Sequence, residues 1–155
     1  MKKVLVWIMS IMVLVGISFA PVKAAENPMK VDGSSLLKNV NEVTSERTIQ
    51  PRGAFLQQGN SSLVKTGANI VTVGGNTIAQ QVVKSIGITV ILERIDENDM
   101  KWVIVDSWNK DAKNATIVQL DQTVTVPRDT FYRARSLHFA ETDTSSSFTD
   151  GLFIK

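Results

Sequence analysis

The sequence contains no cysteine and only one histidine, His138, among its 155 residues. Disulfides are therefore excluded, and a zinc or copper centre, which needs several cysteine or histidine ligands, is not expected. Because 43% of the residues are hydrophobic and 21% are charged, the composition is that of a globular domain. Such a domain must be held together by its hydrophobic core alone.

The first 24 residues have the three parts of a secretory signal peptide. Lys2 and Lys3 are followed by an apolar run from Val4 to Ala20 and then by a small-residue sequence that ends at Ala24. The run is shorter than the roughly 20 apolar residues that a membrane-spanning helix needs. We expect cleavage after Ala24, or one residue later, and a protein that is secreted or associated with the cell wall. Contact with a membrane is expected only through the signal peptide before cleavage.

Cleavage would change the charge of the protein. Residues 1–24 contain three lysines and no acidic residue, so the 17 basic side chains of the whole chain fall to 14, against 15 acidic ones. The formal charge then becomes minus 1 in place of plus 2. Because no strong positive field remains, nucleic acid is not an expected partner.

The next segment, residues 25–52, is polar and contains no aromatic residue. It shows no sustained hydrophobic period, which predicts a flexible leader. Hydrophobic residues between positions 35 and 43 lie near helical spacing, and they predict at most a short helix that needs a surface to pack on. Pro51 and Gly53 mark the expected boundary of a domain over residues 53–155.

Residues 53–155 alternate short β-branched stretches with turn residues, a pattern typical of β-strands. The clearest hairpin runs from Ile86 to Ile95 and returns from Met100 to Trp108, and further strands are expected at 115–126, 130–140 and 148–154. With about seven or eight strands, the sequence predicts an all-β fold, an antiparallel two-sheet sandwich of the immunoglobulin or fibronectin type. A small β-barrel is the alternative.

Tyr132 is the only tyrosine and follows shortly after the turn that contains Asp129. In immunoglobulin-like sandwiches, a tyrosine near the start of the penultimate strand bonds its hydroxyl to the backbone and fixes the corner between the sheets. Tyr132 and Asp129 are therefore predicted to be structural residues of such a corner. A simple cross-strand aromatic contact is the alternative for Tyr132.

Trp102 and Trp108 are six residues apart on one expected strand, and this spacing predicts that both indoles lie on the same face. If that face is open, the rings form a flat platform suited to sugar rings, with Asp106 as a hydrogen-bond acceptor. The alternative is that at least one tryptophan fills the core. Trp102, Asp106 and Trp108 are thus the candidate ligand-binding residues, with a glycan or a surface protein as the expected partner.

The sequence has no complete catalytic motif. His138 could pair with one of the nearby serines (Ser145, Ser146 and Ser147), but the G-x-S-x-G sequence of a serine hydrolase is missing. Glu93 and Asp106 could act as the carboxylate pair of a glycosidase, because they lie on adjacent arms of the expected hairpin. Ordinary solvated positions are the favoured interpretation of these acids, so we expect no catalytic residue.

Acidic residues also gather in two expected loops, at 96–99 and 141–150. Their oxygens could bind Ca²⁺, but neither loop has the D-x-[DN]-x-[DN]-G pattern of a calcium loop. We expect no metal and no cofactor, and a Ca²⁺ site is the alternative.

Several segments, taken in order, resemble an uncharacterised family of small secreted proteins from Gram-positive bacteria. They are residues 32–36, the glycine-spaced segment 53–77, the hairpin with its two tryptophans, and the sequence Phe131-Tyr132-Arg133-Ala134-Arg135 followed by His138. The family pattern usually has glycine before the aromatic pair, where this chain has Asp129-Thr130, so the turn there is expected to differ. The resemblance implies export and a β-rich fold, and it brings no catalytic residues.

These observations favour a secreted or cell-surface binding module without enzymatic activity, whose ligand is a glycan or a component of the cell wall. A released antagonistic or signalling protein of the bacteriocin kind is the second hypothesis. A small extracellular hydrolase is the third.

Overall fold

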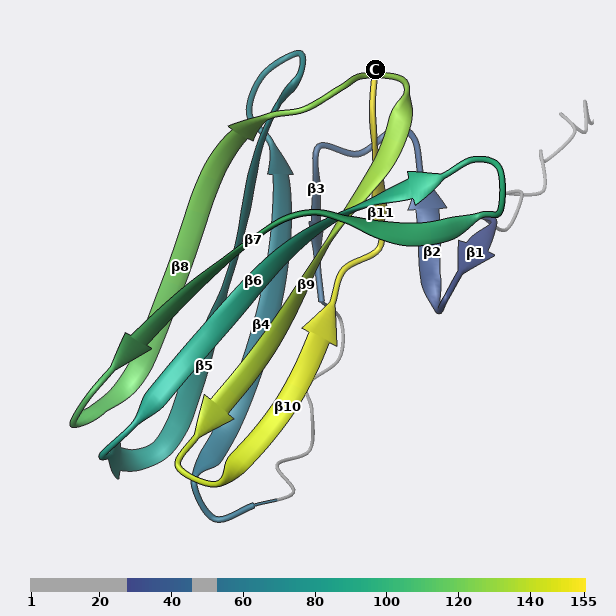
Figure 1. Cartoon of the computed structure of the whole chain (residues 1–155). Helices are drawn as coiled ribbons and strands as arrows, with labels where there is room; N and C mark the ends of the chain where they lie inside the picture. The colour runs from purple at the N-terminus through teal and green to yellow at the C-terminus, as the bar shows by residue number, and fades with distance from the viewer. Residues whose placement is uncertain (1–27, 46–52) are drawn as a thin grey trace, which may run out of the picture.

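The computed structural model describes residues 28–45 and 53–155, which form eleven β-strands (Figure 1). The strands are β1 (Lys30–Val31), β2 (Ser34–Leu37), β3 (Glu42–Thr44), β4 (Leu56–Lys65), β5 (Ile70–Val83), β6 (Ile86–Asp96), β7 (Lys101–Ala112), β8 (Ala115–Thr125), β9 (Thr130–Ala140), β10 (Asp143–Phe148) and β11 (Gly151–Ile154). The prediction of an all-β fold is confirmed. The expected signal peptide, residues 1–24, lies outside the described residues. Within the described ranges, no helix is long and apolar enough to span a membrane.

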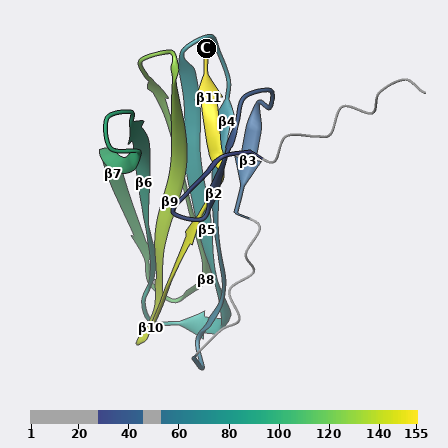
Figure 2. The ribbon, with the colours of Figure 1, turned by 90° about the vertical axis from the view of Figure 1, so that its right-hand side faces the viewer.

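The strands form two sheets that face each other (Figure 2). The larger sheet has the order β1-β2-β11-β9-β6-β7, with β10 also paired to β9, and the smaller sheet has the order β3-β4-β5-β8. The strand pairs of the described residues are antiparallel, apart from the parallel pair β2 and β11. Neither sheet closes on itself, so the fold is a sandwich and the alternative of a β-barrel is wrong.

The core lies between the sheets and consists mainly of aliphatic side chains. On β6, alternate residues from Ile86 to Leu92 are buried in it, and on β9 Tyr132, Ala134 and Ala140 are buried in the same way. The smaller sheet contributes eight buried side chains: Val43, Leu56, Leu63, Val71, Val73, Ala79, Val83 and Val118. Because strand residues alternate between faces, the intervening residues of β9, including Arg133, lie on the outer face of the larger sheet.

Residues 28–45 are not the flexible leader that the sequence predicts, and the short helix expected at 35–43 is replaced by strands. β2 joins the larger sheet beside β11, and β3 joins the smaller sheet beside β4. Ser34 Oγ donates to the carbonyl oxygen of Thr149 at 2.8 Å, and the Ser35 amide donates to Asp150 at 2.7 Å. These partners are 115 residues away in the sequence, so no local pattern could reveal them.

Tyr132 and Asp129 form a corner at the start of β9. The Tyr132 hydroxyl donates to the carbonyl oxygen of Pro127 at 2.9 Å, which is the bond that the tyrosine-corner interpretation requires. Asp129 has φ of 61°, in the left-handed region that favours glycine, and its amide donates to the carbonyl oxygen of Ile154. Asp129 thus adopts a backbone geometry that glycine would adopt more easily.

Replacing Tyr132 with phenylalanine is expected to lower the free energy of unfolding by about 1 kcal/mol, because the substitution removes one hydrogen bond and leaves the Pro127 carbonyl oxygen without this partner. Urea denaturation of the wild type and of Tyr132→Phe measures the difference. Equal midpoints would show that the hydroxyl does not stabilise the corner.

Candidate functional site

Trp102 and Trp108 lie on opposite faces of the larger sheet. Trp108 is paired with Val90 and packs against the core, whereas Trp102 stacks on Arg133 on the outer face, 4.6 Å from the guanidinium carbon to the ring centroid. The cause is a β-bulge: Val105 has no partner on β6, and this extra residue reverses the alternation between the two indoles. The prediction that both rings share one face is therefore wrong, and the flat platform is not formed.

The three acidic or aromatic residues proposed as a ligand site are thus not brought together. Asp106 is exposed, and its Oδ1 accepts a hydrogen bond from the Ser107 amide at 2.8 Å. It is paired with Leu92, whose side chain lies in the core, whereas Glu93 follows on the other side of the bulge and faces outward. Glu93 and Asp106 therefore do not face each other as a glycosidase pair would.

Glu93 and Arg133 form an almost completely buried ion pair on the outer face of the larger sheet. Arg133 Nε donates to Glu93 Oε2 at 2.5 Å, and the exposed fractions of the two side chains are 1% for arginine and 5% for glutamate. Arg135 lies 3.5 Å from the second carboxylate oxygen. Arg133 is also stacked between the rings of Trp102 and Phe148. The guanidinium thus replaces its lost hydration with a carboxylate and two aromatic faces.

This ion pair joins two hairpins that are far apart in the sequence. Arg133 Nη1 donates to Ser34 Oγ at 3.0 Å, at the start of β2, and Trp102 Nε1 donates to the carbonyl oxygen of Val31 at 3.1 Å. As a result, the tip of the β6–β7 hairpin lies beside the β1–β2 hairpin (Figure 1). Arg133 and Trp102 therefore connect the two hairpins.

His138 and Ser147 form a hydrogen bond, but they lie in the interior of the sandwich. The distance from Nε2 to Ser147 Oγ is 2.8 Å, the distance from Nδ1 to Thr77 Oγ1 is 2.9 Å, and the two residues are 1% and 3% exposed. Ser147 also bonds to Ser61 Oγ, which donates to Ser136 Oγ. A substrate cannot reach a pair that is enclosed in this way. The bonds instead satisfy buried polar groups between the sheets.

Burial determines the protonation state of His138. Removal from water lowers its pKa from the usual value of 6.5 to about 4, so the ring is neutral at neutral pH. Gly59 allows the ring to lie at this place, because a Cβ atom at Gly59 would be 2.3 Å from His138 Cδ2.

The acidic residues near the carboxy terminus bind backbone amides of distant segments. Asp143 Oδ2 accepts from the amides of Phe55 and Leu56 at 2.7 and 3.0 Å, and Glu141 accepts from the amides that precede β6. In the other acidic loop, Asp99 pairs with Lys101. Among the described residues, no group of three or more acidic or histidine side chains could hold a metal ion. Asp143 and Glu141 thus hold together segments of the same chain that are far apart in the sequence, a role that the sequence pattern does not predict.

Replacing Asp143 with alanine is expected to lower the free energy of unfolding by about 2 kcal/mol, since two amide hydrogen bonds to a carboxylate are lost. Asp99→Ala is the matched control, because its ion pair with Lys101 lies in solvent and contributes less. Thermal and urea denaturation compare the two variants. Equal losses of stability would contradict the structural role of Asp143.

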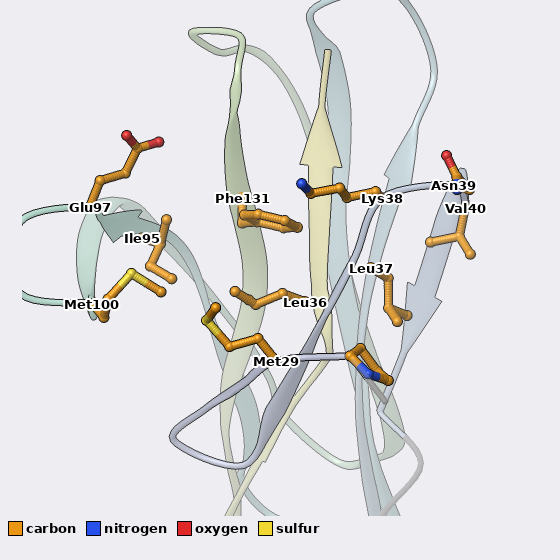
Figure 3. A pocket seen from close by; sticks show the side chains of 11 residues that line it. Met29, Leu36, Leu37, Lys38, Asn39, Val40, Ile95, Glu97, Met100 and Phe131 are labelled. Carbon is orange, nitrogen blue, oxygen red and sulfur yellow. The ribbon is translucent and has the colours of Figure 1, made fainter. Parts of the chain in front are cut away.

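An apolar groove of about 790 Å³ lies between the tip of the β6–β7 hairpin and residues 28–40 (Figure 3). Its apolar lining comes from four separate parts of the chain: Pro28, Met29, Leu36, Leu37, Val40, Ile95, Met100 and Phe131. Met29 is 61% exposed, and Phe131 packs against Phe153 in a tilted arrangement with ring centroids 5.0 Å apart. The volume lies within the range of small-molecule sites.

Sequence reasoning missed this groove completely. One wall is formed by residues 28–40, which lie in the expected leader, and the other by residues 95–100, where the pattern predicts a plain turn. One signal was present: after residue 24 the chain contains only two methionines, Met29 and Met100, and both line the groove. Methionine side chains adapt to irregular apolar ligands, but their separation in the sequence hides their proximity.

Two charged side chains, Lys38 and Glu97, lie on opposite walls of the groove. Lys38 Nζ lies 5.8 Å from the centroid of the Phe153 ring. Figure 3 shows the ammonium group directed toward Phe131, and Glu97 at the hairpin tip on the other side of the groove. Neither charge takes part in an ion pair within the described part of the chain. Counting the described residues only, the groove therefore has one cation without a carboxylate partner on one wall and one anion without a basic partner at the hairpin tip.

A model of a family of unknown function, DUF6147, matches residues 36–151. No curated protein and no solved structure matches the chain. The matched range contains all residues that line the groove, apart from Pro28 and Met29.

Proposed function

The chain belongs to the DUF6147 family of unknown function, and we propose from its geometry that it is a secreted or cell-surface binding module without enzymatic activity. The observation that carries this proposal is the open groove with its exposed apolar side chains. A soluble domain seldom exposes such a recess unless a ligand or partner covers it. The groove is therefore the proposed binding site, in place of the separated tryptophans.

The state of the candidate catalytic residues supports a binding role over a hydrolytic one. Glu93 is held in an ion pair with Arg133, and His138 is enclosed between the sheets together with Ser147. A general acid or base must reach its substrate within hydrogen-bond distance. These groups are engaged with other parts of the protein instead.

The location of the ligand follows from the proposed signal peptide. A chain that is exported after cleavage near Ala24 meets glycans, wall polymers and amphiphiles at the outside of the cell. We therefore place the ligand among the components of the cell surface.

The test uses the chain from residue 25 onward and measures its binding to intact cells and to purified wall fragments. Met100→Glu places a charge in the groove, whereas Ile117→Glu makes the same kind of change at an exposed residue of β8 in the other sheet. We expect Ile117→Glu to bind as the wild type does and Met100→Glu to lose most binding. Equal binding of all three proteins would show that the groove is not the site. Hydrolysis of a wall component that is lost in Glu93→Gln would overturn the proposal of a non-enzymatic protein.

A further inference from the structure

We propose that the groove binds a free single-chain anionic amphiphile, a molecule with one alkyl chain and a carboxylate or phosphate headgroup. This inference rests on the proposed function, because it names the ligand class of the same groove. It depends on three observations: the lining, the distribution of charge, and the small number of basic residues.

The lining fits an alkyl chain better than a sugar. Leu36, Ile95, Met100 and Phe131 present alkyl, thioether and aromatic groups, and Met29 adds a largely exposed thioether at the edge. None of these side chains can donate a hydrogen bond to a sugar hydroxyl, and the polar side chains of the lining are only three, Lys38, Asn39 and Glu97. Removing a methylene group from water strengthens binding by about fourfold, so a chain of several methylenes gains affinity from contact alone.

The two charged side chains of the groove, Lys38 and Glu97, favour one orientation of a bound amphiphile. The Lys38 ammonium lies near the Phe131 and Phe153 rings and has no carboxylate partner in the described residues. An anionic headgroup placed beside it gains a charge-assisted hydrogen bond. At the hairpin tip, Glu97 repels an anion. The headgroup is therefore expected on the Lys38 side, with the alkyl chain along Met29, Ile95 and Met100.

The small number of basic residues favours a free molecule over a lipid within a bilayer. Attraction to an anionic membrane surface generally needs a cluster of about four to eight basic residues. The groove is lined by one lysine and no arginine. A recess between two hairpins can enclose a single chain, whereas a bilayer would have to release a lipid into it.

The test is calorimetric titration of the chain from residue 25 onward with probes below their micelle concentrations. Dodecanoate and dodecyl phosphate are expected to bind once per chain, at least about tenfold more tightly than dodecyltrimethylammonium, which carries the same alkyl chain with a positive headgroup. Decanoate, with two methylenes fewer, is expected to bind about fifteenfold more weakly than dodecanoate.

Charge reversal at Lys38 is the second part of the test. Lys38→Glu is expected to weaken dodecanoate binding by about tenfold, whereas Lys113→Glu is expected to leave it unchanged, because Lys113 lies in the β7–β8 turn at the other end of the hairpin. Both lysines are exposed, so neither substitution disturbs the core.

Several results would overturn the inference. They are equal affinity for the cationic probe, no effect of Lys38→Glu, and binding to vesicles of anionic phospholipid without binding to any free probe. Failure of every alkyl probe, while wall fragments still bind in a way that Met100→Glu abolishes, would refute the amphiphile and leave the proposed function standing. If neither the alkyl probes nor the wall fragments bind, both the amphiphile ligand and the proposed binding function are refuted.

Discussion

Replacing Glu93 with alanine is expected to lower the free energy of unfolding by roughly 3–5 kcal/mol. The substitution leaves the Arg133 guanidinium, whose side chain is 1% exposed, without its carboxylate and out of reach of water. Stacking on Trp102 and Phe148 remains, but aromatic faces replace only part of the lost hydration. Equilibrium denaturation with urea measures the loss.

A double variant separates the cost of a broken pair from the value of the intact pair. Glu93→Met combined with Arg133→Met removes both charges and keeps similar volume, and it is expected to regain most of the stability lost in Glu93→Ala. A loss below about 1 kcal/mol in Glu93→Ala would contradict the buried ion pair, because exposed pairs have effects of that size.

The stability of the protein is expected to fall by about 3 kcal/mol between pH 7 and pH 4 through His138 alone, whose pKa in the folded protein is about 4. In the unfolded chain the ring has its usual pKa of 6.5, so between these two values the unfolded chain binds the proton and the folded protein does not. The stabilisation is thus fully present above pH 6.5 and is lost as the pH falls toward 4. Urea midpoints measured over this range follow the loss.

His138→Gln is the control for this titration, since the amide can still form hydrogen bonds with Thr77 and Ser147 but does not take up a proton in this range. Carboxylates also titrate near pH 4, so the difference between the two proteins isolates the histidine. We expect a shallower dependence on pH in His138→Gln. The same dependence in both proteins would show that the buried ring is not the titrating group.

The strands that the sequence predicts well are those with a strong local hydrophobic pattern. β8 and β9 match their expected ranges to within a residue because more and less buried positions largely alternate along them, and β6 matches because its hydrophobic run is buried almost throughout. The sequence does not predict β1, β2 and β3, because these strands are short and are held by partners far away in the sequence, such as Thr149 and Asp150. Local pattern cannot reveal strands that owe their order to such distant partners.

The candidate site was harder to predict than the fold. One unpaired residue, Val105, reverses the alternation of β7 and separates Trp102 from Trp108, and a bulge has no reliable sequence signal. The groove joins Met29, Leu36, Met100 and Phe131 from four parts of the chain, so its existence depends on the packing of two hairpins.

The most direct test of the binding groove is a nuclear magnetic resonance titration of the chain from residue 25 onward, labelled with ¹³C at the methionine methyl groups. Only Met29 and Met100 then give signals, and both line the groove. Both signals are expected to shift on addition of dodecanoate, with one shared dissociation constant, and Lys38→Glu is expected to raise this constant. Unchanged signals at saturating dodecanoate, or equal shifts with dodecyltrimethylammonium, would contradict it.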